Sequence, residues 1–127
     1  MENRPADLAL ILETFRGMRA RHRSLIVEGV GGWMCPIAKD YYVADLAAEL
    51  GLPVALVVRN RLGALNHALL TVRDIRARGI PFAGIIFNRA GEQNDIAAAT
   101  NRALLEELLN APVLYDIAPG QTELTLS

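Results

Sequence analysis

The stretch PVALVVRNRLGALNHALLTVRDIRARGIPFAGIIFN, residues 53–88, decides the fold class. It opens with an apolar run at residues 53–58 and closes with another at residues 82–87, each of the length of a strand. Between the two runs, apolar residues recur at the three-and-four spacing of one helical face: Leu65, Ala68, Leu69, Val72 and Ile75. Two such strands joined by a helix are typical of a parallel pair with a crossover helix.

Helices and strands continue to alternate outside this stretch. Before it, we predict an amphipathic helix from Pro5 to Met18, a strand at residues 24–30, a loop at residues 31–41 and a helix at residues 43–50. After it, we predict a helix from about residue 95 to residue 109 and a strand at residues 112–115. The predicted inward residues are Leu8, Ile11, Leu12, Phe15 and Met18 in the first helix, and Ile96, Leu104 and Leu108 in the last.

Continuous apolar strands that alternate with helices favour an α/β fold, in which a parallel sheet is covered by helices on both faces. The expected architecture is therefore a three-layer parallel sheet. Because the chain has 127 residues and shows no internal repeat or linker, we expect a single α/β domain over residues 1–127. Ligands of such sheets bind outside the carboxyl ends of the strands.

Composition excludes several classes of protein. Hydrophobic residues make up 52% of the chain and charged residues 21%, which is typical of a globular protein. The net charge of −1 provides no field that would attract nucleic acid or a membrane surface. Cys35 is the only cysteine, which excludes an intrachain disulfide and a four-cysteine zinc site. Without a signal peptide or an apolar stretch approaching the ~20 residues of a membrane span, the protein is expected to be cytoplasmic.

Polar residues and glycines follow the predicted strands. Glu28 could hold a divalent cation or accept hydrogen bonds from the glycine loop behind it, while Gly31 and Gly32 could let backbone approach a ligand or only turn the chain. Asn88 could read a base edge or form an Asx turn. Asn66 lies at a helix start, where free N–H groups favour a carboxylate or phosphate, or where the side chain only caps.

The chain contains no GxxxxGK[ST], GxGxxG or GxSxG motif. Three segments nevertheless resemble, in order and spacing, the carboxyl-terminal part of ATP-dependent dethiobiotin synthetase: VEGVGGWMCPI, LPVALVVRNRLGALNHALLT and GIPFAGIIFNR. The resemblance covers residues 4 to about 118, with RLGALNHALLT as its most specific segment. Related P-loop amidoligases and phosphotransacetylase-associated domains are the competing families. The implied fold is a truncated P-loop NTPase-like domain.

The resemblance implies a cytoplasmic ligase of biotin biosynthesis, which closes a cyclic urea on 7,8-diaminononanoate with carbon dioxide, ATP and magnesium (Mg2+). It implies that Glu28 coordinates Mg2+, that Gly31 and Gly32 lie beside the phosphates and substrate, and that Asn88 reads adenine. A second set of residues is implied to bind the substrate carboxylate across the two-fold interface of a homodimer: Arg61, Leu62, Gly63, Ala64 and Asn66.

The chain also departs from the family pattern. Family members begin with a strand and a P-loop for which these residues have no counterpart, Thr100 stands where a tyrosine is expected, and the tail from Ala118 differs. We therefore expect an incomplete ligase, for which a separate chain supplying the P-loop is a candidate partner. The alternative is a non-catalytic dimerising or carboxylate-binding module derived from a P-loop amidoligase.

Overall fold

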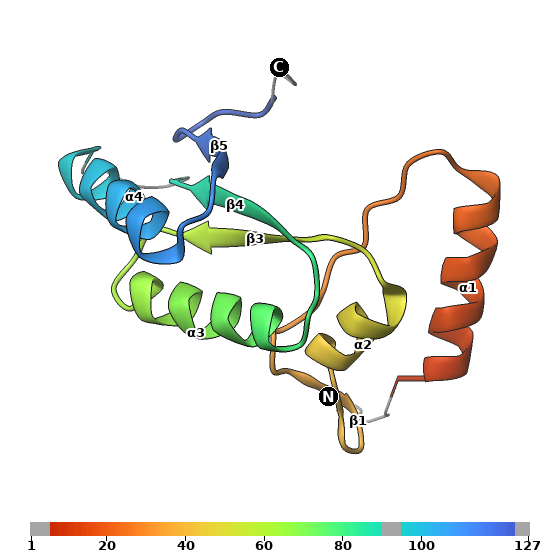
Figure 1. Cartoon of the computed structure of the whole chain (residues 1–127). Coiled ribbons are helices and arrows are strands. Elements are labelled where there is room, and N and C mark those ends of the chain that lie inside the picture. Colours follow the sequence, from red (N-terminus) through yellow and green to blue (C-terminus); the bar gives the residue numbers. More distant parts are fainter. Residues whose placement is uncertain (1–5, 90–94, 124–127) are drawn as a thin grey trace. The chain divides into compact units, whose positions relative to one another are not determined.

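The computed structural model describes residues 6–89 and 95–123. The chain divides into two compact units, residues 1–52 and residues 53–127. The elements shown in Figure 1 are, in chain order, α1 (Leu8–Arg21), β1 (Pro36–Ala38), β2 (Tyr41–Tyr42), α2 (Val43–Leu50), β3 (Val54–Arg59), α3 (Ala64–Ala77), β4 (Phe82–Asn88), α4 (Asp95–Leu109) and β5 (Val113–Ile117). Within the described ranges, no helix has both the length and the apolar character needed to cross a membrane. The single-domain organisation stays a prediction.

The second unit is built on a three-stranded parallel sheet in the order β3-β4-β5. Asn88 lies between Arg59 and Ile117 in the register of the three strands, so their carboxyl ends form one edge. Helix α3 packs against β3, β4 and α4. The predicted α/β class and its parallel sheet are confirmed.

The core of this unit lies between one face of the sheet and helices α3 and α4. Ile85 and Phe87 of β4 are fully buried there, together with Val72 of α3 and Leu105 of α4. Burying a side chain of this size contributes about 1.5–3 kcal/mol. The predicted stripe of α3 is confirmed: Ala68, Val72 and Ile75 are buried, and Leu65 and Leu69 pack against the core.

The opposite face of the sheet is more open than the sequence predicted. Burial alternates along β3, and Val57 is 59% exposed although it lies in a continuous apolar run. On β5, Leu114 is 42% exposed. An apolar run favours burial on both faces, but that burial requires a second packed layer, and only one helical layer contacts the sheet within the described residues of this unit.

Helix α4 buries a different stripe from the one predicted. Leu104 and Leu108 are 37% and 54% exposed, whereas Leu105 and Leu109 are buried. The sequence ALLEELL offers two leucine pairs at the same four-residue spacing, and both fit a helical face. Packing against α3 and the sheet selects one of them. The side chain of Ile96 lies outside the described residues.

In the first unit, α1 begins where Asp7 accepts a hydrogen bond from the Leu10 N–H at 3.1 Å, the usual N-cap geometry. The predicted amphipathic helix is present, but its apolar face is only half-buried and Met18 is 37% exposed. Helix α2 has the predicted bounds, and Gly51 ends it in the left-handed conformation. Pro5 lies outside the described residues.

The predicted strand at residues 24–30 is wrong. These residues form no helix or strand, and Ile26 and Val30 are 94% and 74% exposed. A strand needs a hydrogen-bonding partner, and the strands described in this unit, β1 and β2, pair with each other. Apolar composition cannot supply that partner. The short β1–β2 hairpin also replaces most of the loop predicted at residues 31–41.

The other strands lie close to their predicted positions. The strand predicted at residues 53–58 begins and ends one residue later, and the one predicted at residues 82–87 extends to Asn88. The last strand, predicted at residues 112–115, lies at Val113–Ile117 and therefore includes Asp116.

Gly84 allows β4 and β5 to approach each other closely. Its φ is +139°, and a Cβ built there would lie 2.7 Å from the Pro112 carbonyl oxygen and 2.9 Å from Leu114 Cγ. The next residue, Ile85, donates its N–H to that same carbonyl at 2.9 Å. A side chain at position 84 would therefore disrupt the pairing that starts the β4–β5 ladder.

We expect Gly84→Ala to destabilise the second unit more than Gly79→Ala. Both glycines have positive φ, but a Cβ at Gly79 meets no atom within 4 Å, so Gly79→Ala bears only a backbone cost of about 1–2 kcal/mol. Gly84→Ala adds overpacking against backbone, which costs roughly 1–3 kcal/mol more. Hydrogen exchange at the Ile85 amide measures the difference, and equal protection in the two variants would contradict it.

Candidate functional site

The glycine loop, residues 28–35, precedes the β1–β2 hairpin, which leads into α2. Three backbone hydrogen bonds hold it: Cys35 N–H to the Gly32 oxygen at 3.1 Å, Val43 N–H to the Cys35 oxygen at 3.0 Å, and Ala44 N–H to the Trp33 oxygen at 2.9 Å. The loop is therefore tied to the first turn of α2.

The backbone conformation at both glycines predicted to lie beside a ligand requires glycine. Gly31 and Gly32 have φ values of +79° and +108°, which side chains rarely adopt. Gly31 is also closely packed, because a Cβ there would lie 2.6 Å from Cys35 Sγ, whereas a Cβ at Gly32 would meet nothing within 4 Å. These glycines turn the chain, and their approach to a ligand stays a prediction.

Glu28 is exposed at the start of this loop. No donor of the glycine loop is hydrogen-bonded to it within the described part of the chain, so the alternative that it only accepts such bonds gains no support. Among the described residues, no three His, Cys, Asp or Glu side chains are grouped to hold a metal ion. One carboxylate is still adequate for Mg2+, which commonly binds one or two carboxylates together with phosphate and water.

The start of α3 presents free backbone donors at the sheet's carboxyl edge. Arg61, Leu62 and Gly63 form an exposed turn, and Gly63 is the N-cap with φ +86°. Ala64 and His67 donate their N–H groups to the Arg61 and Gly63 oxygens, each at 3.0 Å. No acceptor is described for the N–H groups of Leu65 and Asn66 in the described ranges.

The Asn66 side chain does not cap this helix, because the cap residue is Gly63 and no side chain bonds to the first turn. The alternative that Asn66 only caps is therefore wrong. Its exposed amide lies on the same turn as two free N–H groups, at the positive end of the helix dipole. This arrangement suits a carboxylate or a phosphate.

Asn88 ends β4, at the middle of the same edge. Its carbonyl accepts the Asn60 N–H at 3.2 Å, and the following Arg89 donates its N–H to the Ile117 oxygen at 2.9 Å. The half-buried Asn88 is thus held between the ends of β3 and β5.

Polar side chains near Asn88 contact one another in a way that the sequence did not predict, although Asn60, Arg89 and Asp116 fall within the strand ends expected to form the candidate edge. They link the three strand ends to α4: Asn60, Arg89, Asn101, Arg102 and Asp116. Asn60 and Asp116 stand at strand ends, which was a usable signal. Arg102 and Asn101 lie within a helical pattern, and nothing in the sequence marks them.

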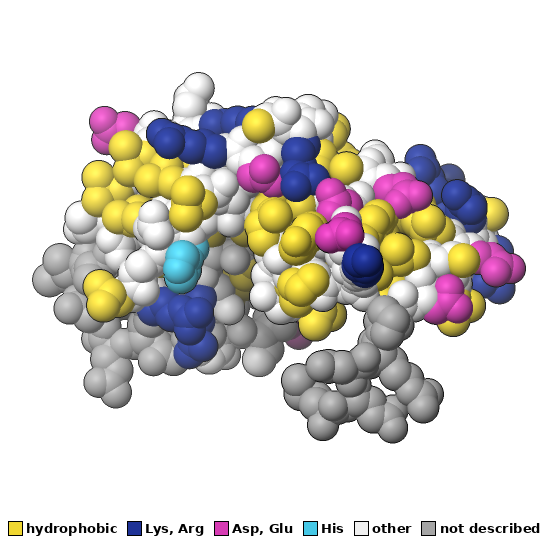
Figure 2. Space-filling view, turned by 90° about the horizontal axis from the view of Figure 1, so that it is seen from below, with side chains coloured by type: hydrophobic (Ala, Val, Ile, Leu, Met, Phe, Trp, Pro, Cys, Tyr) yellow, Lys and Arg dark blue, Asp and Glu magenta, His cyan; other side chains and the backbone are white. Residues whose placement is uncertain are grey.

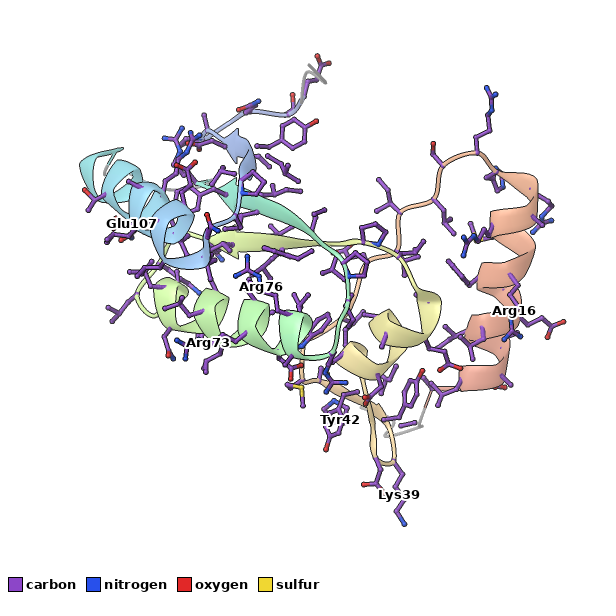
Figure 3. All side chains as sticks on the ribbon, viewed as in Figure 1. Arg16, Lys39, Tyr42, Arg73, Arg76 and Glu107 are labelled. Atoms are coloured by element: carbon purple, nitrogen blue, oxygen red, sulfur yellow. The ribbon has the colours of Figure 1, made fainter. Side chains whose placement is uncertain are left out.

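Tyr41 and Tyr42 have structural roles at the start of α2, where Figure 3 shows Tyr42. The Tyr42 N–H donates to Asp45 Oδ2 at 2.7 Å as part of a capping box. The Tyr41 hydroxyl donates to Glu49. Burial raises the pKa of Tyr41 to about 12, and the hydrogen bond to Glu49 and the charges of Glu49 and Asp45 raise it in the same direction.

Comparison with known proteins identifies the family. A family model described as an AAA domain matches residues 1–124. The chain is 44% identical over 121 residues to the ATP-dependent dethiobiotin synthetase BioD of Akkermansia muciniphila, covering 95% of this chain and 57% of that protein. The chain belongs to the dethiobiotin synthetase family.

Two further family members show the same relationship. The proteins of the same name from Aromatoleum aromaticum and Bacillus subtilis are 48% and 36% identical over 108 and 114 residues. These alignments cover 85% and 90% of this chain, and 48% and 49% of the two relatives. The chain thus spans about half the length of the curated relatives it matches.

The glycine loop gives a first prediction for this site: Gly31→Ala should destabilise the first unit more than Gly32→Ala. Each change places an alanine at positive φ, at a cost of about 1–2 kcal/mol. Only Gly31→Ala also drives a Cβ into Cys35. Urea unfolding followed by Trp33, the only tryptophan, measures both variants. Adding Cys35→Ala to Gly31→Ala should remove most of the difference, and no effect of that second change would contradict the contact.

A second prediction concerns pH. Because the pKa of Tyr41 is raised above its usual 10.0, the folded state holds this proton after the unfolded state has lost it. The stabilisation is fully present below pH 10 and should be lost as pH rises from about 10 to about 12. Tyr41→Phe should flatten this part of the Trp33-detected stability curve. An unchanged slope in the variant would show that other groups cause the loss.

Proposed function

We propose that this chain carries the substrate-carboxylate and adenine-recognition parts of a dethiobiotin synthetase, an ATP- and Mg2+-dependent ligase that converts 7,8-diaminononanoate and carbon dioxide to dethiobiotin. The observation that carries this proposal is the start of α3. It presents the N–H groups of Leu65 and Asn66 and the exposed Asn66 amide together, in the segment most specific to the family.

The turn that begins α3, residues 61–66 (the α3 turn), has electrostatics that suit a carboxylate. Two N–H groups without acceptors and a helix dipole favour an anion, and Arg61 adds an exposed positive charge beside them. These features support the role that the resemblance implies for Arg61, Leu62, Gly63, Ala64 and Asn66, which is to bind the substrate carboxylate. Gly63 has a conformational role, because its φ of +86° directs the chain into α3.

The resemblance gives ATP and Mg2+ two separate sets of candidate ligands. Glu28 would hold Mg2+ as an exposed oxygen donor, and Gly31 and Gly32 would let the backbone lie beside the phosphates. Asn88 would bind adenine, since an amide offers both a donor and an acceptor. When bound, ATP supplies the phosphoryl group that activates the substrate's carbamate for attack by the neighbouring amine.

A homodimer would complete the substrate site. Leu62 is fully exposed at the tip of the α3 turn, and Leu70, two helical turns along, is 60% exposed. Figure 2 shows hydrophobic side chains open to solvent on one face of the molecule. Apolar side chains beside a candidate site are typical of an interface, and a second copy of the chain is the partner that the family resemblance implies.

A complementation assay tests the ligase. The 127 residues contain no GxxxxGK[ST] segment, so we expect the chain alone to bind ATP weakly and to form no dethiobiotin. The amino-terminal part of the Akkermansia muciniphila enzyme, produced separately, should restore product formation in the presence of Mg2+. Carboxylate binding without any restored activity would instead favour the non-catalytic module.

Asn66→Ala should weaken 7,8-diaminononanoate binding by about 1.5–3 kcal/mol, because a hydrogen bond to a charged group is lost. Titration of the labelled chain measures this, with Leu65 and Asn66 as the amides expected to shift. Arg61→Ala is the matched control for simple attraction. Its effect should shrink with added salt while that of Asn66→Ala persists. The assignment fails if no amide of residues 62–67 shifts at saturating ligand.

A further inference from the structure

A strand-end cluster joins α4 to the carboxyl ends of all three strands of the second unit. It consists of Asn60, Arg89, Asn101, Arg102 and Asp116. Asn101 Nδ2 donates to Asn60 Oδ1 at 2.6 Å, which links α4 to the end of β3. Helix α4 thus contacts the strand ends through polar side chains as well as through the apolar core.

Asp116 is the branch point of this cluster. Its Oδ2 accepts a hydrogen bond from Nη1 of Arg102, in α4, at 2.9 Å. Its Oδ1 accepts a hydrogen bond from Nε of Arg89, the residue that follows β4, at 2.5 Å. The side chains of Asp116 and Arg89 are each 21% exposed, so this pair is partly shielded from water. Partial shielding strengthens a charged hydrogen bond relative to one on the open surface.

Asn88 stands directly beside this branch point. The backbone on both sides of it is fixed, by Asn60 N–H at its carbonyl and by the Arg89 N–H at Ile117. Asp116 then holds the side chain of the very next residue, Arg89. The Asp116 carboxylate is therefore one of the contacts that hold the end of β4, in addition to the two backbone hydrogen bonds.

The charges of the cluster argue against a phosphate site. Arg102 is bound to Glu106 at 3.4 Å as well as to Asp116, so two arginines are matched by two carboxylates. A locally neutral group with engaged guanidinium groups offers little attraction to an anion. It is compatible with an uncharged ring beside Asn88.

We propose that Asp116 is a positioning residue that aligns Asn88 with the nucleobase and thereby sets base selectivity. The proposal rests on the proposed function in one respect, the assignment of Asn88 to adenine. Asp116 itself does not contact the base. An asparagine amide can pair with both the amino group and a ring nitrogen of adenine, and this two-point contact is sensitive to its direction.

The experiment compares adenosine with inosine, which carries an oxygen in place of the adenine amino group. Dissociation constants are measured by NMR titration of the intact chain, following the Asn88 side-chain amide. The unsubstituted chain should prefer adenosine by about fivefold, the equivalent of one ordinary hydrogen bond. Asp116→Asn keeps the shape of the side chain but removes its charge, and should reduce the preference to below about twofold.

Glu106→Gln is the matched control. It removes the other carboxylate bound to Arg102 but leaves the link between Asp116 and Arg89, so it should retain the preference for adenosine. General loosening of the unit would weaken the binding of both nucleosides alike and leave the ratio of their dissociation constants unchanged. If Asp116→Asn does not fold, Arg89→Gln, which breaks the same link from its other side, is measured instead, and a preference reduced by at least about twofold is expected.

The outcomes separate the two levels of the proposal. An unsubstituted chain with no preference for adenosine overturns the assignment of Asn88 to adenine and the role of Asp116 with it. A preference that survives Asp116→Asn, or Arg89→Gln where that variant is used, overturns only the role of Asp116. Equal loss in Glu106→Gln also overturns it. Loss confined to variants that break the Asp116 contacts supports it.

Discussion

The second unit depends on the burial of Ile85 and Phe87 on the central strand β4. Both side chains are fully buried against α3 and α4, and they fix which face of the sheet carries the helices. Once that face is set, the register of the three parallel strands brings Arg59, Asn88 and Ile117 to one edge. The candidate site is a consequence of this packing, because its residues come from segments that are separated in the sequence.

Two regions with different electrostatics lie along this edge. The start of α3 has free N–H groups, the positive end of a helix dipole and an exposed arginine, all of which favour an anion. Near the end of β4, by contrast, the charges of two arginines are balanced by those of two carboxylates in ion pairs. A ligand with a carboxylate and a ligand with an uncharged ring would therefore choose different parts of the same edge.

In the first unit, backbone hydrogen bonds hold a loop in place next to a segment without regular secondary structure. Residues 24–30 form no strand, yet the glycine loop that begins at Glu28 is held by backbone hydrogen bonds to the start of α2. Gly31 meets two demands there, a positive φ and close contact with Cys35. Such a loop can present backbone to a ligand because few side chains stand in the way.

The sequence by itself determined the helices, the three parallel strands and several turns, because these follow from local periodicity and from residues such as Gly51 and Gly63 at helix ends. It also marked Asn88 and the α3 turn as candidate ligand sites, because polar residues after apolar strands are a local pattern. Assignment to the substrate carboxylate and to adenine came from the family resemblance and stays a proposal.

Only the tertiary structure decided which leucine pair of α4 is buried, that residues 24–30 have no strand partner among the described residues, and that Asp116 joins Arg89 to Arg102. Arg89 and Asp116 are 27 residues apart in the chain. Hydrogen bonds and burial over such separations depend on how elements pack, and a local pattern of residue types does not contain that information.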